Sequence, residues 1–342
     1  TNFTLLAVPL FVFMGVVLEK SGVAEELLDT MGRVFGRIRG GLAISVVMVG
    51  ALLAATTGVV GASVVTMTVI ALPSMLKRGY APSLASGTIA ASGTLGQIIP
   101  PSIILILLGD VIGVPVGELF IGAVVPGIML ILAYILYIVY VAWRHPHLAP
   151  AVRDDNPELA ALWISVLKSL LPPLLLIIAV LGSIFYGIAS PTESAAVGAL
   201  GSLILAALHR RLTLPNLRDA MEKTARLTSM VFLIFIGATA FGLVFVGMGG
   251  DQILEGLGHD PRIHLNIDPL WFALLIAINL QTSFLTPPFG FSLFYLKASA
   301  PPTLKLMDIY RGIMPFVGIQ IIVLALLISF PAISLWLPNL MG

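Results

Sequence analysis

The fold of this chain is decided by one interrupted apolar segment, Ser92-Gly93-Thr94-Leu95-Gly96-Gln97-Ile98-Ile99-Pro100-Pro101-Ser102. The segment lies inside an apolar run that extends from Ser83 to Leu108. Two adjacent prolines remove two backbone donors and clash with the preceding turn, so a continuous helix cannot pass through them. The small residues allow close approach of the backbone, and the serine and threonine residues add hydroxyl groups. We therefore expect a broken helix over 83–108.

A second segment of the same kind lies in the other half of the chain. It reads Gln281-Thr282-Ser283-Phe284-Leu285-Thr286-Pro287-Pro288-Phe289-Gly290 and interrupts the run 269–297. Two such breaks in matching positions are what an internal duplication leaves. Paired interrupted helices in corresponding halves point to the binding site of a secondary transporter.

The composition places the chain in a membrane. Hydrophobic residues make up 58% and charged residues 10%, with a mean hydropathy of +1.05, whereas soluble domains carry about 25% charged residues. Apolar runs at 119–143, 162–188, 225–248 and 309–337 exceed the roughly 18 residues that cross a bilayer as a helix. We expect an all-α, multi-pass integral membrane protein in a lipid bilayer.

The residue content and motifs of the sequence exclude several function classes. Cysteine is absent, which excludes disulfides, zinc-thiolate sites and cysteine nucleophiles. No basic tract with interleaved aromatic residues predicts nucleic-acid binding. No nucleotide-binding loop, nucleophile elbow or paired-histidine metal motif is present. We predict no catalytic residue and no cofactor.

The interruptions divide the chain into two predicted inverted repeats. The first repeat, 1–143, contains a span (3–18), a polar arm helix (22–37), a re-entrant hairpin (40–76), the broken helix (83–108) and a span (119–143). A polar loop (144–161) precedes the second repeat, 162–342. That repeat contains spans (162–188 and 191–208), an arm (214–226), a candidate hairpin (226–258), the broken helix (269–297) and a final span (309–337).

One observation disagrees with an inverted repeat. Basic residues flank both the first hairpin and the second arm, although inversion places those two elements on opposite sides of the membrane. The chain also starts at Thr1 within an apolar helix, and we expect it to begin inside a larger protein whose N-terminal helices are missing.

The interruptions are also where chemistry is expected. Half-helix C-termini present carbonyl groups suited to Na⁺, and half-helix N-termini present amides suited to a carboxylate. The candidate binding residues are Thr56, Thr57, Gly58, Gly61 and Ser63 at the hairpin tip; Ser92, Gly93, Thr94, Gly96, Pro100, Pro101 and Ser102; Thr239; and Thr282, Ser283, Thr286, Pro287, Pro288 and Gly290. The alternative is that small residues only aid helix packing, and for the isolated cluster 237–240 that alternative is favoured.

The carboxylates near the spans give a weaker indication of a functional site. Asp110, Glu118 and Glu193 lie at span ends rather than within spans. Ser190, Pro191 and Glu193 form the pattern of a helix start, with a cap, a proline in the first turn and an acidic residue behind it.

Several short segments of the chain resemble those of a known family. The residues that carry the resemblance are Pro9-Leu10-Phe11, Gly79-Tyr80, Gly96 to Ser102, Pro126-Gly127, Pro191-Thr192-Glu193-Ser194-Ala195-Ala196 and Thr286 to Gly290. They are similar, in the same order and over essentially the whole chain, to the large membrane subunit of tripartite ATP-independent periplasmic (TRAP) transporters of bacteria and archaea. The hairpin tip departs from the pattern: Thr57-Gly58-Val59-Val60-Gly61-Ala62-Ser63 stands where many members have a Ser-Gly-Ser type sequence.

The resemblance implies an elevator-type transporter in the cytoplasmic (inner) membrane, driven by a Na⁺ gradient. It implies three partners: a periplasmic substrate-binding protein, a small four-helix membrane subunit and a small carboxylate substrate. By the same resemblance, the hairpin tip and first break form one ion site, and 237–240 with the second break forms another. The arms then link the moving part to the scaffold.

Three alternatives remain open from the sequence. The first is a self-sufficient ion-coupled carrier of the same architecture. The second, an intramembrane enzyme, requires a pair of embedded carboxylates or a serine–histidine pair. The third is a passive channel, which suits paired half-helix sites less well than an occluding carrier does.

Overall fold

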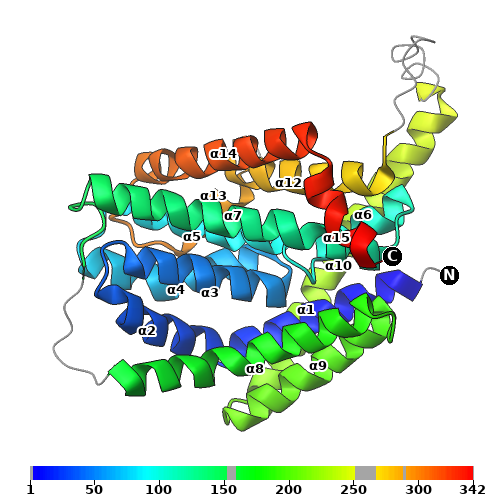
Figure 1. The fold of residues 1–342 in the computed structure, drawn as a ribbon. Coiled ribbons are helices and arrows are strands. Elements are labelled where there is room, and N and C mark those ends of the chain that lie inside the picture. Colours follow the sequence, from blue (N-terminus) through cyan, green and yellow to red (C-terminus); the bar gives the residue numbers. More distant parts are fainter. Residues whose placement is uncertain (1–2, 152–158, 251–266, 288–289, 342) are drawn as a thin grey trace.

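The structure is a computed structural model that describes residues 3–151, 159–250, 267–287 and 290–341. The first half contains η1 (Phe3–Leu6), α1 (Ala7–Lys20), α2 (Val23–Gly36), α3 (Gly41–Thr57), α4 (Val60–Lys77), α5 (Pro82–Thr94), η2 (Leu95–Gln97), α6 (Ile103–Ile112) and α7 (Val116–Arg144). The second half contains α8 (Leu159–Phe185), α9 (Pro191–Leu208), α10 (Leu214–Gly247), α12 (Pro269–Leu285), α13 (Phe291–Ser299), α14 (Leu306–Ser329) and α15 (Ala332–Met341). Figure 1 shows their arrangement.

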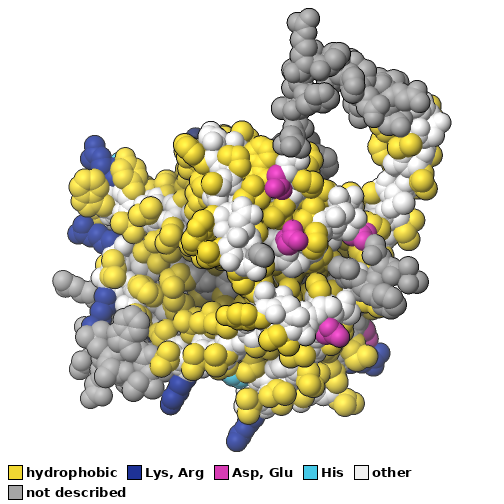
Figure 2. All heavy atoms as spheres, turned by 45° about the vertical axis from the view of Figure 1, so that its right-hand side comes forward, with side chains coloured by type: hydrophobic (Ala, Val, Ile, Leu, Met, Phe, Trp, Pro, Cys, Tyr) yellow, Lys and Arg dark blue, Asp and Glu magenta, His cyan; other side chains and the backbone are white. Residues whose placement is uncertain are grey.

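The described part of the chain is all-α and suited to a membrane. It contains no strand. Six of its helices, α4, α7, α8, α9, α10 and α14, are long and apolar enough to span a bilayer, and a seventh span results if α1 and α2, bent by 56°, count as one. Large apolar side chains such as Leu200, Leu233 and Ile322 are more than half exposed, and Figure 2 shows apolar side chains over most of the visible surface. The expectation of an all-α integral membrane protein is confirmed.

Charged residues gather at two opposite ends of the helices. At the end that we call the basic end, Arg78 after α4 and Arg211 after α9 line one cavity, and Ala81 donates a hydrogen bond to the loop after α7 at Leu148 (3.0 Å). At the acidic end, Glu118 and Asp268 line another cavity. Figure 2 shows most of the visible Lys and Arg side chains along the left and lower edges, and most of the visible Asp and Glu side chains on the face turned forward.

The two broken helices enter the molecule from these opposite ends. α5 starts at the basic end after Ala81, whereas α12 starts at the acidic end after Asp268 (Figure 1). α14 packs against α5 so closely at Gly312 and Gly87 that a Cβ atom on either residue would overlap the backbone of the other helix. The two broken helices therefore start at opposite ends of the molecule (Figure 1) and share one core.

The structure differs from the sequence prediction at the second arm and hairpin. α10 runs unbroken from Leu214 to Gly247, so residues 214–226 are the start of a long helix instead of a separate arm. No proline interrupts residues 216–247, and the hydroxyl of Thr239 donates to the carbonyl of Phe235 inside the helix (2.8 Å). Residues 251–258 of the predicted hairpin lie outside the described residues.

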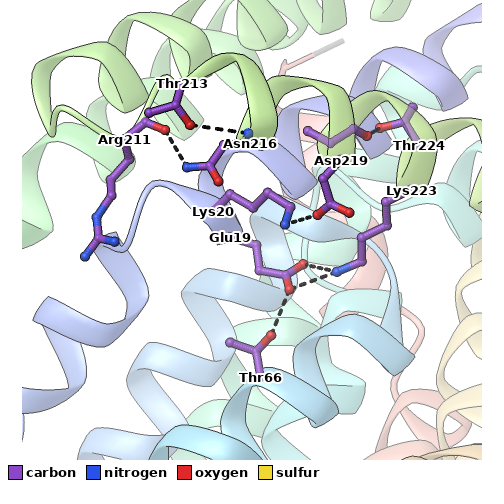
Figure 3. A network of polar contacts seen from close by, with 10 residues as sticks. Glu19, Lys20, Thr66, Arg211, Thr213, Asn216, Asp219, Lys223 and Thr224 are labelled. Atoms are coloured by element: carbon purple, nitrogen blue, oxygen red, sulfur yellow. Dashed lines mark hydrogen bonds and ion pairs between the residues drawn. The ribbon is translucent and has the colours of Figure 1, made fainter.

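The charged residues of 214–226 are explained by packing against the charged end of α1 rather than by a separate arm. Lys223 Nζ contacts both carboxylate oxygens of Glu19 (2.9 and 2.8 Å), and Lys20 pairs with Asp219 (Figure 3). Thr66 on α4 also donates to Glu19 (3.1 Å). The start of α10 therefore lies beside the end of α1, at the same end as the first hairpin's base. This placement explains why both segments are basic.

The other predicted elements correspond closely to helices. α2 is the predicted arm, α3 and α4 form the predicted hairpin, and α7, α8 and α9 are the predicted spans. The predicted final span, 309–337, is two helices, because α14 ends at Ser329 and Pro331 precedes α15. Of the predicted polar loop 144–161, residues 152–158 lie outside the described residues. The predicted start of α9 is confirmed: Ser190 and Glu193 form a reciprocal capping box with Pro191 in the first turn.

Candidate functional site

The tip of the first hairpin is a tight turn between α3 and α4. α3 ends at Thr57, whose side chain lies outside the described residues, and Gly58 adopts a left-handed conformation (φ 59°) that favours glycine. Thr56 is buried and donates to the carbonyl of Leu53 (2.8 Å), and buried Ser63 donates to the carbonyl of Val59 (3.2 Å). A hydroxyl oxygen is the type of group that can accept a donor or bind a cation.

The first break separates α5 and the short turn η2 from α6. Pro100 and Pro101 lie in it, and Ser102 caps α6 by accepting from the amide of Leu105 (3.4 Å) while donating to the carbonyl of Gln97 (2.7 Å). Ser92 and Thr94 are fully buried on the last turns of α5 and donate to carbonyls of the same helix. The helix ends and hydroxyl oxygens at the break therefore face the interior of the molecule rather than its surface.

Glycines allow the hairpin to lie directly on this break. A Cβ atom on Gly96 would be 2.6 Å from the carbonyl oxygen of Ala54 on α3. One on Gly93 would overlap Val64 on α4, and one on Gly58 would be 3.2 Å from the side chain of Ile103 at the start of α6. The hairpin tip therefore packs directly against the first break, and their predicted role as one ion site stays a prediction.

The second break separates α12 from α13. Thr286 donates to the carbonyl of Thr282 (3.0 Å), and Gly290 begins α13 in a left-handed conformation (φ 40°). Thr282, Ser283 and Thr286 are half-buried and Pro287 is exposed, whereas Pro288 lies outside the described residues. This break is therefore less enclosed than the first one.

The two breaks meet each other at the hairpin. Gln281 on α12 and Thr94 on α5 are both fully buried, and the amide nitrogen of Gln281 donates to the hydroxyl of Thr94 (3.4 Å). On the other side of the second break, a Cβ atom on Gly61 of the hairpin would be 2.8 Å from the ring of Tyr295 on α13. Three segments that are far apart in the sequence therefore surround one buried polar centre.

Two glutamines at this centre are absent from the residues predicted to bind. Both side-chain polar atoms of Gln97 and the carbonyl oxygen of Gln281 are buried and have no hydrogen-bond partner among the described residues. The hydroxyl of Thr88, earlier on α5, is also buried and has no hydrogen-bond partner among the described residues. A buried polar group without a partner costs roughly 2–7 kcal/mol in an apolar medium, so these atoms are suited to a ligand that is bound there.

A signal for Gln281 does exist in the sequence. Thr94 and Gln281 stand at the same distance from the first proline of their breaks, Pro100 and Pro287. In two repeats that face each other, equivalent positions near the common axis meet. Matching the two breaks residue by residue would therefore have indicated the pair.

Thr239 is not part of this centre. It lies on an exposed stretch of α10, and a Cβ atom on neighbouring Gly237 would meet nothing within 4 Å. The structure therefore does not place the cluster 237–240 among the buried polar groups described above.

The chemistry of the centre follows from its groups. The described side chains there are neutral hydroxyls and carboxamides, and the main chain adds carbonyls at the helix ends. Oxygen ligands without thiolates or imidazoles suit hard cations. A site of neutral oxygens suits a monovalent ion such as Na⁺ better than a multivalent one, and the starts of α6 and α13 offer amides to an anion.

Comparison with known proteins agrees with this architecture. Residues 1–257 and 262–333 match the family described as the tripartite ATP-independent periplasmic transporter, DctM component. The chain is 30% identical to the C4-dicarboxylate TRAP transporter large permease protein DctM of Pseudomonas aeruginosa, an alignment that covers 100% of this chain and 87% of that protein.

Two further relatives carry other substrates in their names. The ectoine TRAP transporter large permease protein TeaC of Halomonas elongata is 29% identical over 98% of this chain and 86% of that protein. The sialic acid TRAP transporter large permease protein SiaM of Vibrio cholerae is 28% identical over 99% of this chain and 87% of that protein. The prediction of a transport protein rather than an enzyme is confirmed, and the chain belongs to the DctM family, the large permease subunits of TRAP transporters.

Proposed function

We propose that this subunit carries a small carboxylate across the membrane in a Na⁺-coupled step, and that the ion binds where the hairpin tip and the two broken helices meet. The observation that carries the proposal is the contact between Gln281 and Thr94, with unpaired carboxamide groups beside it. Those atoms offer oxygen ligands in a place where leaving them unpaired is costly.

Packing supports a moving unit and a fixed unit. α3 to α6 pack with α7, α12, α13 and α14 around the two breaks, whereas α1 packs with α9 and α10, and α8 with α9. α2 packs against both α3 and α8, and α1 also packs against α3, so these two helices connect the two groups. We propose that the first group moves as the elevator, that the second group is the scaffold, and that α2 is the linking arm.

The distribution of charged residues supports one orientation of the protein in the membrane. Lys and Arg residues concentrate at the basic end and are enriched in cytoplasmic loops of membrane proteins. The basic end is therefore proposed to face the cytoplasm and the acidic end the periplasm. On this orientation α12 enters from the periplasmic side, where a substrate-binding protein would deliver its ligand, and a small membrane subunit would contact the scaffold group.

The test is uptake into proteoliposomes that contain the protein with its small membrane subunit. Labelled C4-dicarboxylate, sialic acid and ectoine are offered under an inward Na⁺ gradient, with and without the binding protein. The proposal expects uptake of a carboxylate only when the Na⁺ gradient and the binding protein are both present. Uptake that needs no binding protein indicates a self-sufficient carrier, and uptake that is indifferent to Na⁺ refutes the coupling.

A further inference from the structure

A cavity at the basic end lies well away from the polar centre. It measures about 560 Å³ and lies between α2, the last turns of α4 and the turn that follows α9. Part of its wall is apolar, formed by Leu28, Leu42 and Ile70, and the rest is charged or otherwise polar. It therefore combines an apolar wall with a charged lining at the end of the membrane-spanning helices.

Two arginines in this cavity have no ion-pair partner among the described residues. Arg78 lies at the end of α4, and its Nη1 atom is buried with no hydrogen-bond partner in the described part of the chain. Arg211 follows α9 and holds its guanidinium beside Gly22, where a Cβ atom would be 3.7 Å from Nε. A guanidinium is always charged and presents a planar set of donors that fits phosphate, so two of them in one cavity favour an anion.

Carboxylates on α2 also line the cavity. Asp29 is paired with Arg33 (2.8 Å), and Glu26 accepts from Ser169 (2.6 Å). Glu25 is exposed and has no such partner among the described residues. A ligand with only negative charges would meet repulsion from these carboxylates, whereas one that carries an ammonium group next to its phosphate would pair with both the carboxylates and the arginines.

We propose that this cavity binds the headgroup of a zwitterionic phospholipid of the phosphoethanolamine type, with Arg78 and Arg211 on the phosphate and Glu25 on the ammonium group. Val69, next to Ile70 in the chain, and Ile38, between α2 and α3, are 58% and 57% exposed and offer apolar surface to acyl chains. The amphipathic helix α2 forms one wall of the cavity, as expected of a helix at the membrane interface. The proposal rests on the membrane placement of the chain and not on Na⁺ coupling.

The experiment is native mass spectrometry of the purified protein with its small subunit, after delipidation and titration with phosphatidylethanolamine. Phosphatidylglycerol and phosphatidylcholine are titrated in parallel, and soluble phosphoethanolamine and inorganic phosphate serve as probes without acyl chains. The variants are Arg78→Gln and Arg211→Gln. The control is Lys77→Gln, which alters an exposed cation next to Arg78 that does not line the cavity. A thermal melt of each variant shows whether it is folded.

The expected result is that the first bound phosphatidylethanolamine is lost in both arginine variants, with binding weakened by at least about tenfold per arginine, and is retained in the control. Phosphatidylglycerol, which lacks the ammonium group, is expected to bind more weakly, and Glu25→Gln should remove that preference. Equal binding in arginine variants and control overturns the proposal. So does equally tight binding of inorganic phosphate, which indicates a soluble-anion site, or loss of the small subunit without loss of lipid, which indicates a protein interface.

Discussion

Replacing Gly96 by alanine tests whether the hairpin must lie directly on the first broken helix. The added Cβ atom would be 2.6 Å from the carbonyl oxygen of Ala54 and 3.0 Å from its carbonyl carbon. Both are backbone atoms, so no rotamer change can relieve the overlap. The same carbonyl already accepts from the amide of Gly58 (2.9 Å), which closes α3 at the hairpin tip.

The size of the effect follows from these distances. Ordinary contact starts at 3.4 Å, so α3 and η2 must separate by about 0.8 Å, and overpacking of this kind costs about 1–3 kcal/mol. Alanine restricts the unfolded chain more than glycine does, which offsets the loss by about 0.4–1 kcal/mol. The fold should survive, whereas a shift that approaches 1 Å at a site of defined geometry can lower its activity by about a hundredfold.

The assay is Na⁺-driven uptake in proteoliposomes, together with a thermal melt in detergent. The matched control is Gly237→Ala, because a Cβ atom at Gly237 meets nothing within 4 Å. We expect Gly96→Ala to lose most uptake with a modest drop in melting temperature, and Gly237→Ala to retain both. Full uptake by Gly96→Ala, or equal loss in both variants, would refute the reasoning.

Three further outcomes are expected. Glu19→Gln should lower the melting temperature by an amount equivalent to about 1–2 kcal/mol, because the half-buried Lys223 loses its carboxylate; a melt unchanged from wild type contradicts the network of Figure 3. Gly312→Ala should destabilise by about 3 kcal/mol through its backbone contact with α5, while Gly318→Ala, in open space on the same helix, should be neutral or slightly stabilising; equal melts of the two would show that the contact is not tight. Thr94→Val should weaken the Na⁺ dependence of uptake more than the stability, and an unchanged Na⁺ dependence would exclude its hydroxyl as a ligand.

Local chemistry made the breaks predictable from the sequence. Two adjacent prolines forbid a continuous helix wherever they stand, and a glycine at the hairpin tip permits the left-handed turn that Gly58 adopts. These effects depend on a few neighbouring residues. The positions of the first hairpin and of both broken helices therefore followed without knowledge of the packing.

Tertiary contacts made other parts unpredictable. The charges of 214–226 look like those of an interfacial arm, but Lys223 and Asp219 pair with the end of α1, which only the folded chain brings near. The small residues 237–240 contain no proline, so they do not break α10. The unpaired oxygen of Gln281 depends on burial by helices from the other half. The equivalent positions of Thr94 and Gln281 in the two breaks indicate their contact, but they do not indicate the unpaired oxygen.

The central claim is that a Na⁺ ion binds at the buried carboxamide between the two breaks, and a direct Na⁺-binding titration of the purified protein tests it. Gln281→Leu is compared with Gln320→Leu. Gln320 is also fully buried, with a carbonyl oxygen that has no partner among the described residues, but its amide nitrogen donates to the hydroxyl of Tyr134 (2.8 Å), between α14 and α7. The prediction is that Gln281→Leu weakens Na⁺ binding by about tenfold or more, while Gln320→Leu binds as the wild type does. Wild-type affinity in Gln281→Leu, or the same loss in both variants, would contradict it.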